Sequence, residues 1–215
     1  SATVEAAKVG GDFYDVFELG HAEVGIVIGD VSGKGLGAAT LTSQVKNTIK
    51  AYSRDGESPS SILYKTNNLL SKTGIAPVFV TAFFGIMDTA SGKLTYCCAG
   101  HPPPIVKQGS RVLPLTTDSP VLGVFDDLTF VDHEATLKKG DVLVAYTDGV
   151  IEAMVGKEFF GEARLTRLIK SLKGVSATDI PQKIFKRIAN FSQNNLADDV
   201  ALLAVALNNV ETAGK

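Results

Sequence analysis

Hydrophobic and polar residues alternate in short blocks along this chain, and the blocks predict both strands and helices. The apolar run within residues 23–29 is continuous, which indicates a strand that is buried on both faces. Ala38, Leu41, Val45 and Ile49 recur at helical spacing. The predicted strands are residues 3–8, 13–19, 23–29, 78–88, 93–99, 104–107, 111–115, 128–137, 141–147 and 200–207. The predicted helices are residues 38–52, 59–72 (after a Ser58 N-cap), 162–173 and 178–193.

The order of these elements indicates the fold class. Runs of strands and pairs of helices follow one another in blocks and do not alternate one for one, which favours an α+β fold with antiparallel sheets. Since no repeat, low-complexity tract or linker interrupts the pattern, we expect a single domain over residues 1–215. Its core should span about residues 4–207, followed by a polar tail at 208–215.

Composition narrows the classes of protein that fit. Hydrophobic residues make up 45% of the 215 residues, and no apolar window is long enough to span a membrane. A net charge of −2 argues against nucleic-acid binding. Cys97 and Cys98 are neighbours on a predicted strand and cannot easily bridge, so we expect no disulfide framework and a reducing, cytoplasmic location.

Five aspartates stand where predicted strands begin or end. Asp30 and Asp148 each follow an apolar run, Asp198 and Asp199 directly precede one, and Asp12 follows a glycine pair. Turn chemistry explains any one of them, because Asp often closes turns and caps helices. Several together would repel one another unless a cation compensated them, and all-oxygen ligands suit Mg²⁺ or Mn²⁺.

Other motifs fit poorly. The segment 29–35, GDVSGKG, lacks the spacing and the hydroxyl residue of a phosphate-binding P-loop. Lys34 in that segment is either a solvated loop residue or an attractor of substrate phosphate. His101, in AGHPPP, is either a structural residue of its loop or a second layer of support beside the site.

Five motifs together identify a family. They are VGGDFYD at 9–15, GDVSGKG at 29–35, AGHPPP at 99–104, YTDGVIE at 146–152 and DDVA at 198–201. With these motifs in this order, the chain closely resembles the bacterial stage-II-sporulation-E/RsbU type of PP2C-like protein serine/threonine phosphatase. The resemblance implies an αββα sandwich, two antiparallel sheets flanked by helix pairs, with two Mn²⁺ or Mg²⁺ ions at one edge.

The resemblance also implies roles for the aspartates. Asp30 would bridge both ions, with the Val31 carbonyl as a further ligand, while Asp148 and Asp198 would bind one ion. Asp12 resembles an acid of the outer shell or of a third metal, and Asp199 falls where many relatives have asparagine. The catalytic set would be Asp30, Asp148 and Asp198, acting through a metal-activated water.

The resemblance leaves two parts of the mechanism open. Ser32 stands where eukaryotic members have a histidine that is thought to protonate the leaving group, so the general acid is unassigned. No counterpart of the eukaryotic phosphate-binding arginine is evident either.

Partners follow from the family as well. The usual substrate is a phosphorylated anti-anti-sigma protein of the STAS type in a partner-switching pathway. An upstream regulatory domain usually precedes the phosphatase domain, and a homodimer is possible. Two alternatives are a degenerate PP2C-like domain that binds a partner without turnover, and a hydrolase of small phosphate esters.

Overall fold

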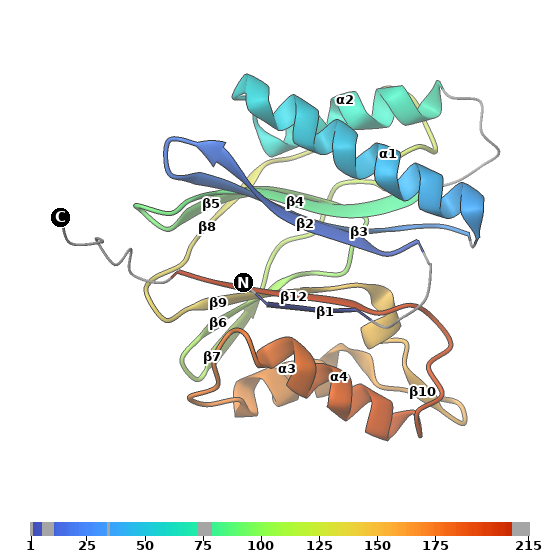
Figure 1. The fold of residues 1–215 in the computed structure, drawn as a ribbon, viewed down its shortest axis with the longest axis vertical. Helices are drawn as coiled ribbons and strands as arrows, with labels where there is room; N and C mark the ends of the chain where they lie inside the picture. The colour runs from blue at the N-terminus through green and yellow to red at the C-terminus, as the bar shows by residue number, and fades with distance from the viewer. Residues whose placement is uncertain (1, 6–10, 34, 73–78, 208–215) are drawn as a thin grey trace.

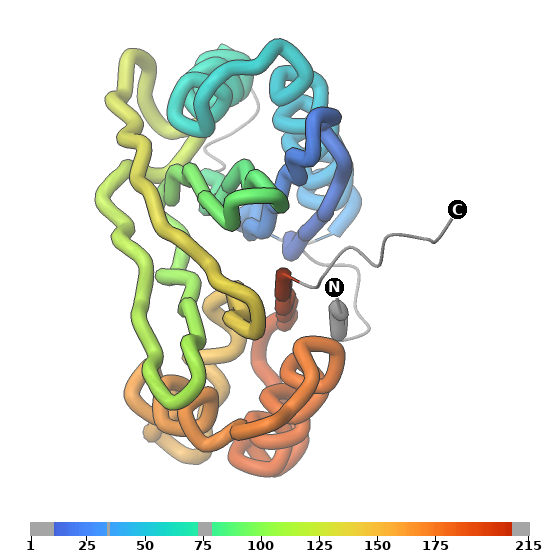
Figure 2. The backbone as a smooth tube through the Cα atoms, turned by 90° about the vertical axis from the view of Figure 1, so that its left-hand side faces the viewer, coloured from blue at the N-terminus to red at the C-terminus, as the bar shows by residue number. Residues whose placement is uncertain are grey.

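The computed structural model describes residues 2–5, 11–33, 35–72 and 79–207. Two five-stranded antiparallel sheets are stacked between two pairs of helices (Figure 1). The predicted layers, helix–sheet–sheet–helix, are therefore observed. The tube view, turned by a quarter, shows the two helix pairs at opposite ends of the stack (Figure 2).

The first sheet has the order β1-β12-β9-β6-β7 and is called sheet A here. Its strands are β1 (Ala2–Glu5), β12 (Ala201–Ala206), β9 (Val142–Tyr146), β6 (Ile105–Gln108) and β7 (Arg111–Pro114). The second, sheet B, has the order β2-β3-β4-β5-β8. Its strands are β2 (Phe13–Gly20), β3 (Glu23–Val31), β4 (Val80–Asp88), β5 (Lys93–Ala99) and β8 (His133–Thr136).

Helices α1 (Leu36–Tyr52) and α2 (Pro59–Ser71) cover the outer face of sheet B. Helices α3 (Gly161–Ser171) and α4 (Ile180–Phe191) cover sheet A. The four α1 residues that the periodicity selects are all buried, so the helical spacing identified the packed face correctly. Ser58 accepts a hydrogen bond from the Ser61 amide, and Pro59 occupies the first turn of α2, as predicted.

The apolar core has three layers. One lies between sheet B and α1–α2, one between the two sheets, and one between sheet A and α3–α4. Alternate residues of β3 and β4 face opposite layers: Ile26, Ile28 and Phe83 face sheet A, whereas Val27 and Phe84 face the helices. Both faces are therefore buried, which explains the continuous apolar run of β3.

Several predicted boundaries were wrong. The strand predicted at 128–137 is shorter, because β8 covers only His133–Thr136. The Asp132 carboxylate instead accepts hydrogen bonds from the amide and hydroxyl of Ser60, both at 2.7 Å, which ties this segment to the start of α2. Helix α1 begins at Leu36, two residues before the prediction, with Gly35 as its N-cap at φ 90°.

Short elements escaped the pattern. Two-residue strands β10 (Met154–Val155) and β11 (Glu158–Phe159) form a hairpin, and 3₁₀ turns η1 and η2 cover Ser53–Asp55 and Asp148–Val150. The predicted strand end at 6–8, the tail at 208–215 and Lys34 lie outside the described residues. Within the described ranges, no helix combines the length and the hydrophobicity needed to cross a membrane.

Candidate metal centre

The predicted site acids lie in or next to the ends of β3 and β9 and the starts of β2 and β12, at one edge of the sandwich. Strand β3 ends just after Asp30, and Asp12 precedes β2, whose Phe13 pairs with Gly29. Strand β9 ends at Tyr146, which pairs with Leu202 near the start of β12. Asp148 and the pair Asp198–Asp199 therefore leave sheet A at the edge where Asp12 and Asp30 leave sheet B. Antiparallel pairing within each sheet, together with the stacking of the two sheets, brings together residues that are up to 187 positions apart.

Thr147 links the two sheets. Its buried hydroxyl donates a 2.8 Å hydrogen bond to the Asp12 carboxylate and accepts a 2.9 Å hydrogen bond from the Ala201 amide. The Thr147 amide in turn donates to the Ala201 carbonyl at 3.1 Å. One side chain thus fixes Asp12 of sheet B against the ends of β9 and β12.

At Gly11, the backbone before β2 lies very close to the end of β3. The Val31 amide donates to the Gly11 carbonyl at 3.1 Å, and the Thr42 hydroxyl of α1 donates to the same carbonyl, also at 3.1 Å. A Cβ atom added to Gly11 would lie 2.1 Å from the Val31 carbonyl oxygen and 2.5 Å from Asp30 Oδ1. Only glycine leaves the space beside these two proposed ligand atoms free.

The carboxylates interact electrostatically across the edge. Burial, together with the charges of Asp30, Asp148 and Asp199, raises the pKa of Asp12 to about 7, against an opposing effect of the Thr147 hydrogen bond. Burial and the charges of Asp148 and Asp198 raise the pKa of Asp30 to about 6. Burial and Asp198 also raise the pKa of Asp148. The site therefore disfavours its own negative charge, as expected for acids that a cation would compensate.

The donor atoms at this edge are carboxylate and carbonyl oxygens, which suit hard divalent ions. Within the described residues, no three His, Cys, Asp or Glu side chains form a ready-made group for one metal ion. The donor set fits Mg²⁺ or Mn²⁺ nonetheless, because Mg²⁺ usually keeps several waters and takes only one or two carboxylates. The mutual repulsion of the acids and the free space at Gly11 support the same fit.

Comparison with known proteins identifies the family. The model of the stage II sporulation protein E (SpoIIE) family matches residues 20–208. The chain belongs to this family. It is 28% identical over 205 residues to the phosphoserine phosphatase RsbU of Bacillus subtilis, covering 94% of this chain and 61% of that protein. Overall it spans 37–61% of the length of three curated relatives.

Solved structures confirm the fold of this SpoIIE-family chain. The PP2C phosphatase domain of Bacillus subtilis SpoIIE, solved with a fragment of its regulatory domain, superposes with a TM-score of 0.87 at 21% identity. That match covers 97% of this chain and 62% of the other. The structure of RsbX in complex with magnesium gives a TM-score of 0.70 at 18% identity, covering 96% and 94%. The predicted PP2C-like α+β sandwich is therefore confirmed.

The SpoIIE-family chain also carries an acid that the sequence reasoning did not single out. Glu152 lies one turn after Asp148, and its amide donates to the Asp148 carbonyl at 2.8 Å. Burial and the charges of Asp148 and Asp198 raise the pKa of Glu152. The spacing of four residues in TDGVIE was the available signal, because residues four apart in a helical turn lie on the same side.

His101 is buried and contacts the strand that pairs with β3. It is 2% exposed, and its Nδ1 lies 3.0 Å from the hydroxyl of Thr81, the residue that pairs with Asp30 in the β3–β4 ladder. Burial lowers the pKa of His101 to about 3, although the Tyr146 backbone acts in the opposite direction. The ring is therefore neutral at physiological pH. Of the two roles considered from the sequence, support beside the site fits this position.

The Ser32 hydroxyl is hydrogen-bonded, and the two cysteines are buried. Ser32 accepts a hydrogen bond from the Phe79 amide at 2.9 Å, so its hydroxyl is engaged in the backbone of the edge. Cys97 and Cys98 are buried free thiols, and burial raises the pKa of both. Neither thiol has the thiolate character of an enzymatic nucleophile.

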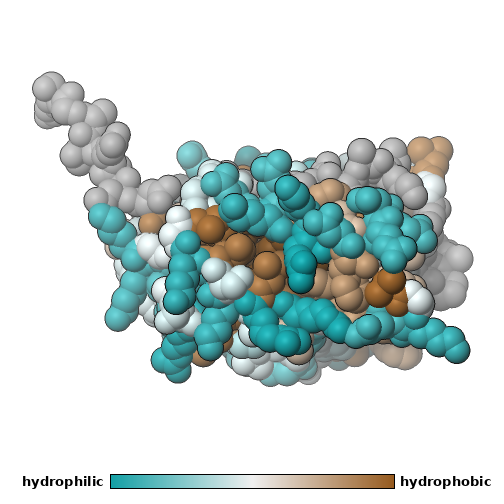
Figure 3. All heavy atoms as spheres, turned by 90° about the horizontal axis from the view of Figure 1, so that it is seen from below, coloured by the Kyte–Doolittle hydropathy of each residue, from teal (hydrophilic) through white to brown (hydrophobic). Residues whose placement is uncertain are grey.

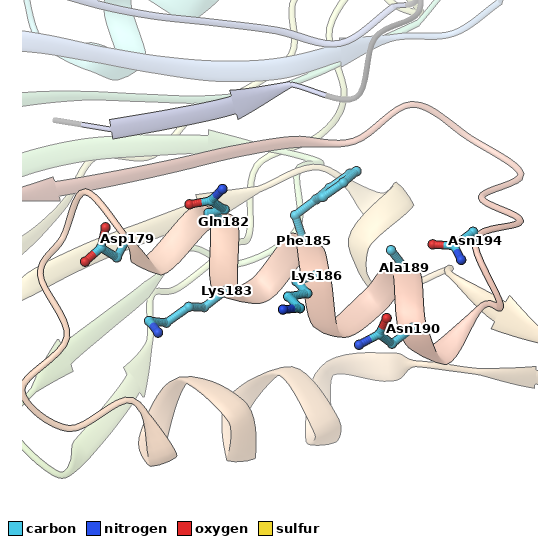
Figure 4. Close-up of a pocket in the computed structure, with 8 residues that line it drawn as sticks. All are labelled: Asp179, Gln182, Lys183, Phe185, Lys186, Ala189, Asn190 and Asn194. Atoms are coloured by element: carbon cyan, nitrogen blue, oxygen red, sulfur yellow. The ribbon is translucent and has the colours of Figure 1, made fainter.

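A surface hollow of about 660 Å³ lies along α4, and its described lining includes none of the proposed ligands (Figure 4). Its lining includes Lys183, Lys186 and Asn190, with Asp179 as its one acid, while Phe185 points toward sheet A. Seen from below, this side of the molecule is mainly hydrophilic around an apolar strip (Figure 3). Because this hollow has one carboxylate in its lining whereas the sheet edge gathers several, we place the functional site at the edge.

Proposed function

We propose that this chain is a metal-dependent protein phosphatase that hydrolyses phosphoserine and phosphothreonine with two Mn²⁺ or Mg²⁺ ions. The observation that carries the proposal is the gathering of carboxylates from both sheets at one edge, where burial and the neighbouring charges raise the pKa of Asp12, Asp30 and Asp148. Membership of the SpoIIE family and similarity to a protein named phosphoserine phosphatase support the same chemistry.

The proposed ligands keep the roles that the family suggests. Asp30 would hold both ions, with the Val31 carbonyl as a further ligand, and Asp148 and Asp198 would hold one ion. Asp12 would hold a water of the outer shell or a third ion, and Asp199 would contribute at the same edge. Such ions, when bound, would activate a water for attack at neutral pH and would neutralise charge on the phosphoryl oxygens.

The chain's own residues position this chemistry. Thr147 orients the Asp12 carboxylate and holds it against sheet A. Neutral His101 contacts Thr81, the cross-strand neighbour of Asp30, and, being buried, does not protonate the leaving group. Because both cysteines are buried, the proposed nucleophile is a water molecule and not a thiolate.

The biological setting is part of the proposal. A phosphorylated STAS-type protein is the substrate, in a partner-switching pathway in the cytoplasm, and residues 4–207 act as one catalytic domain. An upstream regulatory domain controls it in the full-length protein, in accord with relatives that extend beyond the matched region. Association into a homodimer is the proposed means of that control. Lys34 attracts the substrate phosphate.

Phosphate release from a panel of phosphorylated STAS-domain proteins tests the proposal. We expect release with Mn²⁺, no release in metal-free buffer that contains a chelator, and a preference for one member of the panel. Turnover of p-nitrophenyl phosphate without any phosphoprotein turnover would instead favour a hydrolase of small esters. Binding of a phosphoprotein without release would favour a degenerate binding domain.

A further inference from the structure

Phe79 is an exposed aromatic residue beside the proposed site. It lies directly before β4 and is 45% exposed, although the next residue, Val80, is fully buried. Two hydrogen bonds of 2.9 Å join its backbone to Ser32, from the Ser32 amide to the Phe79 carbonyl and from the Phe79 amide to the Ser32 hydroxyl. These bonds continue the β3–β4 pairing by one residue, so the backbone of Phe79 is fixed.

The register of the sheet places Phe79 on the same face as Asp30. Asp30 pairs with Thr81, and paired residues of an antiparallel ladder project to the same side. Phe79 precedes Thr81 by two residues and therefore projects to that side too. Further along this face, Phe83 is buried between the two sheets. On this face Phe79 lies beyond Thr81, at the carboxylate edge, and its ring is partly exposed to solvent.

We infer that Phe79 is a specificity residue, which receives an apolar side chain of the protein substrate near the phosphoserine. This inference rests on the proposed function and names a feature of its substrate. A strand advances about 3.3 Å per residue, so Phe79 lies about 7 Å along β4 from the residue paired with Asp30. An extended substrate chain advances by the same amount. The side chain that reaches Phe79 is therefore about two positions from the phosphoserine.

The occupant follows from the place of Phe79 and from its chemistry. A substrate chain that brings a phosphoseryl group to Asp30 while running parallel to β4 places its neighbouring residues beside Phe79. An apolar neighbour would bury the exposed ring, which is favourable in proportion to the apolar area removed from water. A polar neighbour would gain nothing there. The substrate class is thus a phosphoprotein with an aliphatic residue close to its phosphoserine.

Two phosphopeptides test the inference. One carries leucine and the other serine two positions from the phosphoserine on both sides, and kcat/KM is measured for each with Mn²⁺. Wild-type protein should prefer the leucine peptide by about five- to tenfold. Phe79→Ala should reduce this preference to about twofold or less, and Phe79→Leu should restore most of it.

Tyr64→Ala is the matched control. Tyr64 is also aromatic and is 39% exposed, but it lies on α2, on the outer side of sheet B. This variant should keep the wild-type preference. Equal kcat/KM for both peptides in the wild-type protein, or an unchanged preference in Phe79→Ala, would overturn the inference while leaving the phosphatase proposal intact. Failure of the wild-type protein to hydrolyse either peptide or p-nitrophenyl phosphate would instead overturn the proposed function, and this inference with it.

Discussion

At the scale of single residues, Asp30 is the proposed ligand on which metal binding and turnover should depend most. Asp30→Asn removes one charge from a cluster of mutually repelling acids and also removes the proposed bridging ligand. We expect a loss of about 10³-fold or more in turnover, because metal-ion catalysis is worth several kcal/mol. Mn²⁺ affinity, measured by calorimetry, should fall in parallel.

Asp126→Asn is the control for this change, since Asp126 is exposed in the loop after Leu122 and lies outside the proposed ligand set. It should retain Mn²⁺ affinity and turnover. Wild-type metal affinity in Asp30→Asn would show that Asp30 is not a ligand.

Thr147 is expected to matter for folding as well as for the site. Thr147→Val keeps a similar volume but leaves the Asp12 carboxylate and the Ala201 amide without their partner. The free energy of unfolding should fall by about 1–3 kcal/mol, the cost of unsatisfied buried groups. Urea denaturation measures it, and Thr147→Ser should recover most of the loss. A cost below about 0.5 kcal/mol would mean that water replaces the hydroxyl.

Some of these site residues could be predicted from the sequence, and others could not. Asp12, Asp30 and Asp148 stand out because an acid beside a buried apolar run is unusual. The role of Thr147 depends on its contact with Asp12, 135 positions away, which no local pattern contains. Likewise, the burial of His101 follows from the packing of its loop against β4 and not from its neighbours in sequence.

At the scale of elements, Gly11 and Gly37 form a natural pair for comparison. Gly11→Ala would force β3 to shift, since its Cβ would meet the Val31 carbonyl oxygen at 2.1 Å. We expect a cost of about 1–3 kcal/mol in stability and at least a tenfold loss of Mn²⁺ affinity. Thermal denaturation and metal titration measure the two effects.

Gly37→Ala serves as the control, because it lies in α1 and a Cβ there would have no heavy atom within 4 Å. The added methyl should leave stability unchanged or raise it by up to about 1 kcal/mol. If Gly11→Ala behaved like Gly37→Ala, the close approach of the two backbones would not constrain the site.

The elements that the sequence predicted best are those with sustained periodicity. Helix α1 and strands β3 and β4 bury regular rows of apolar residues, and their positions were confirmed within a few residues. The strand predicted at 128–137 was too long because Asp132 accepts hydrogen bonds from the start of α2. This tertiary contact overrides β propensity. The β10–β11 hairpin has too few residues in each strand to show any periodicity.

At the scale of the whole molecule, the packing of the two sheets brings carboxylates that repel one another to one edge. The raised pKa values of Asp12 and Asp30 mean that the folded protein binds protons which the unfolded chain releases above about pH 4. These acids therefore stabilise the metal-free fold least at neutral pH. Burial of His101 acts oppositely below pH 6.5, because the unfolded chain binds its proton more readily.

A comparison of metal-free wild-type protein with Asp30→Asn cancels the effect of His101. The variant should gain stability over the wild type as pH rises from about 4 to 6, and the gain should level off above the Asp30 pKa. Mn²⁺ should stabilise only the wild type, and more strongly at pH 7 than at pH 5, since protons compete with the metal. A gain that shrinks with rising pH would contradict the assigned shift.

The central claim is that the carboxylate edge binds divalent ions and uses them to hydrolyse phosphoserine. Phosphate release from a phosphoseryl protein, followed against Mn²⁺ concentration after complete chelation, tests it most directly. The account predicts no release without metal, a saturable rise with Mn²⁺ in the wild type, and no rise in Asp30→Asn. Undiminished release in the chelated protein, or an Asp30→Asn curve that matches the wild type, would contradict it.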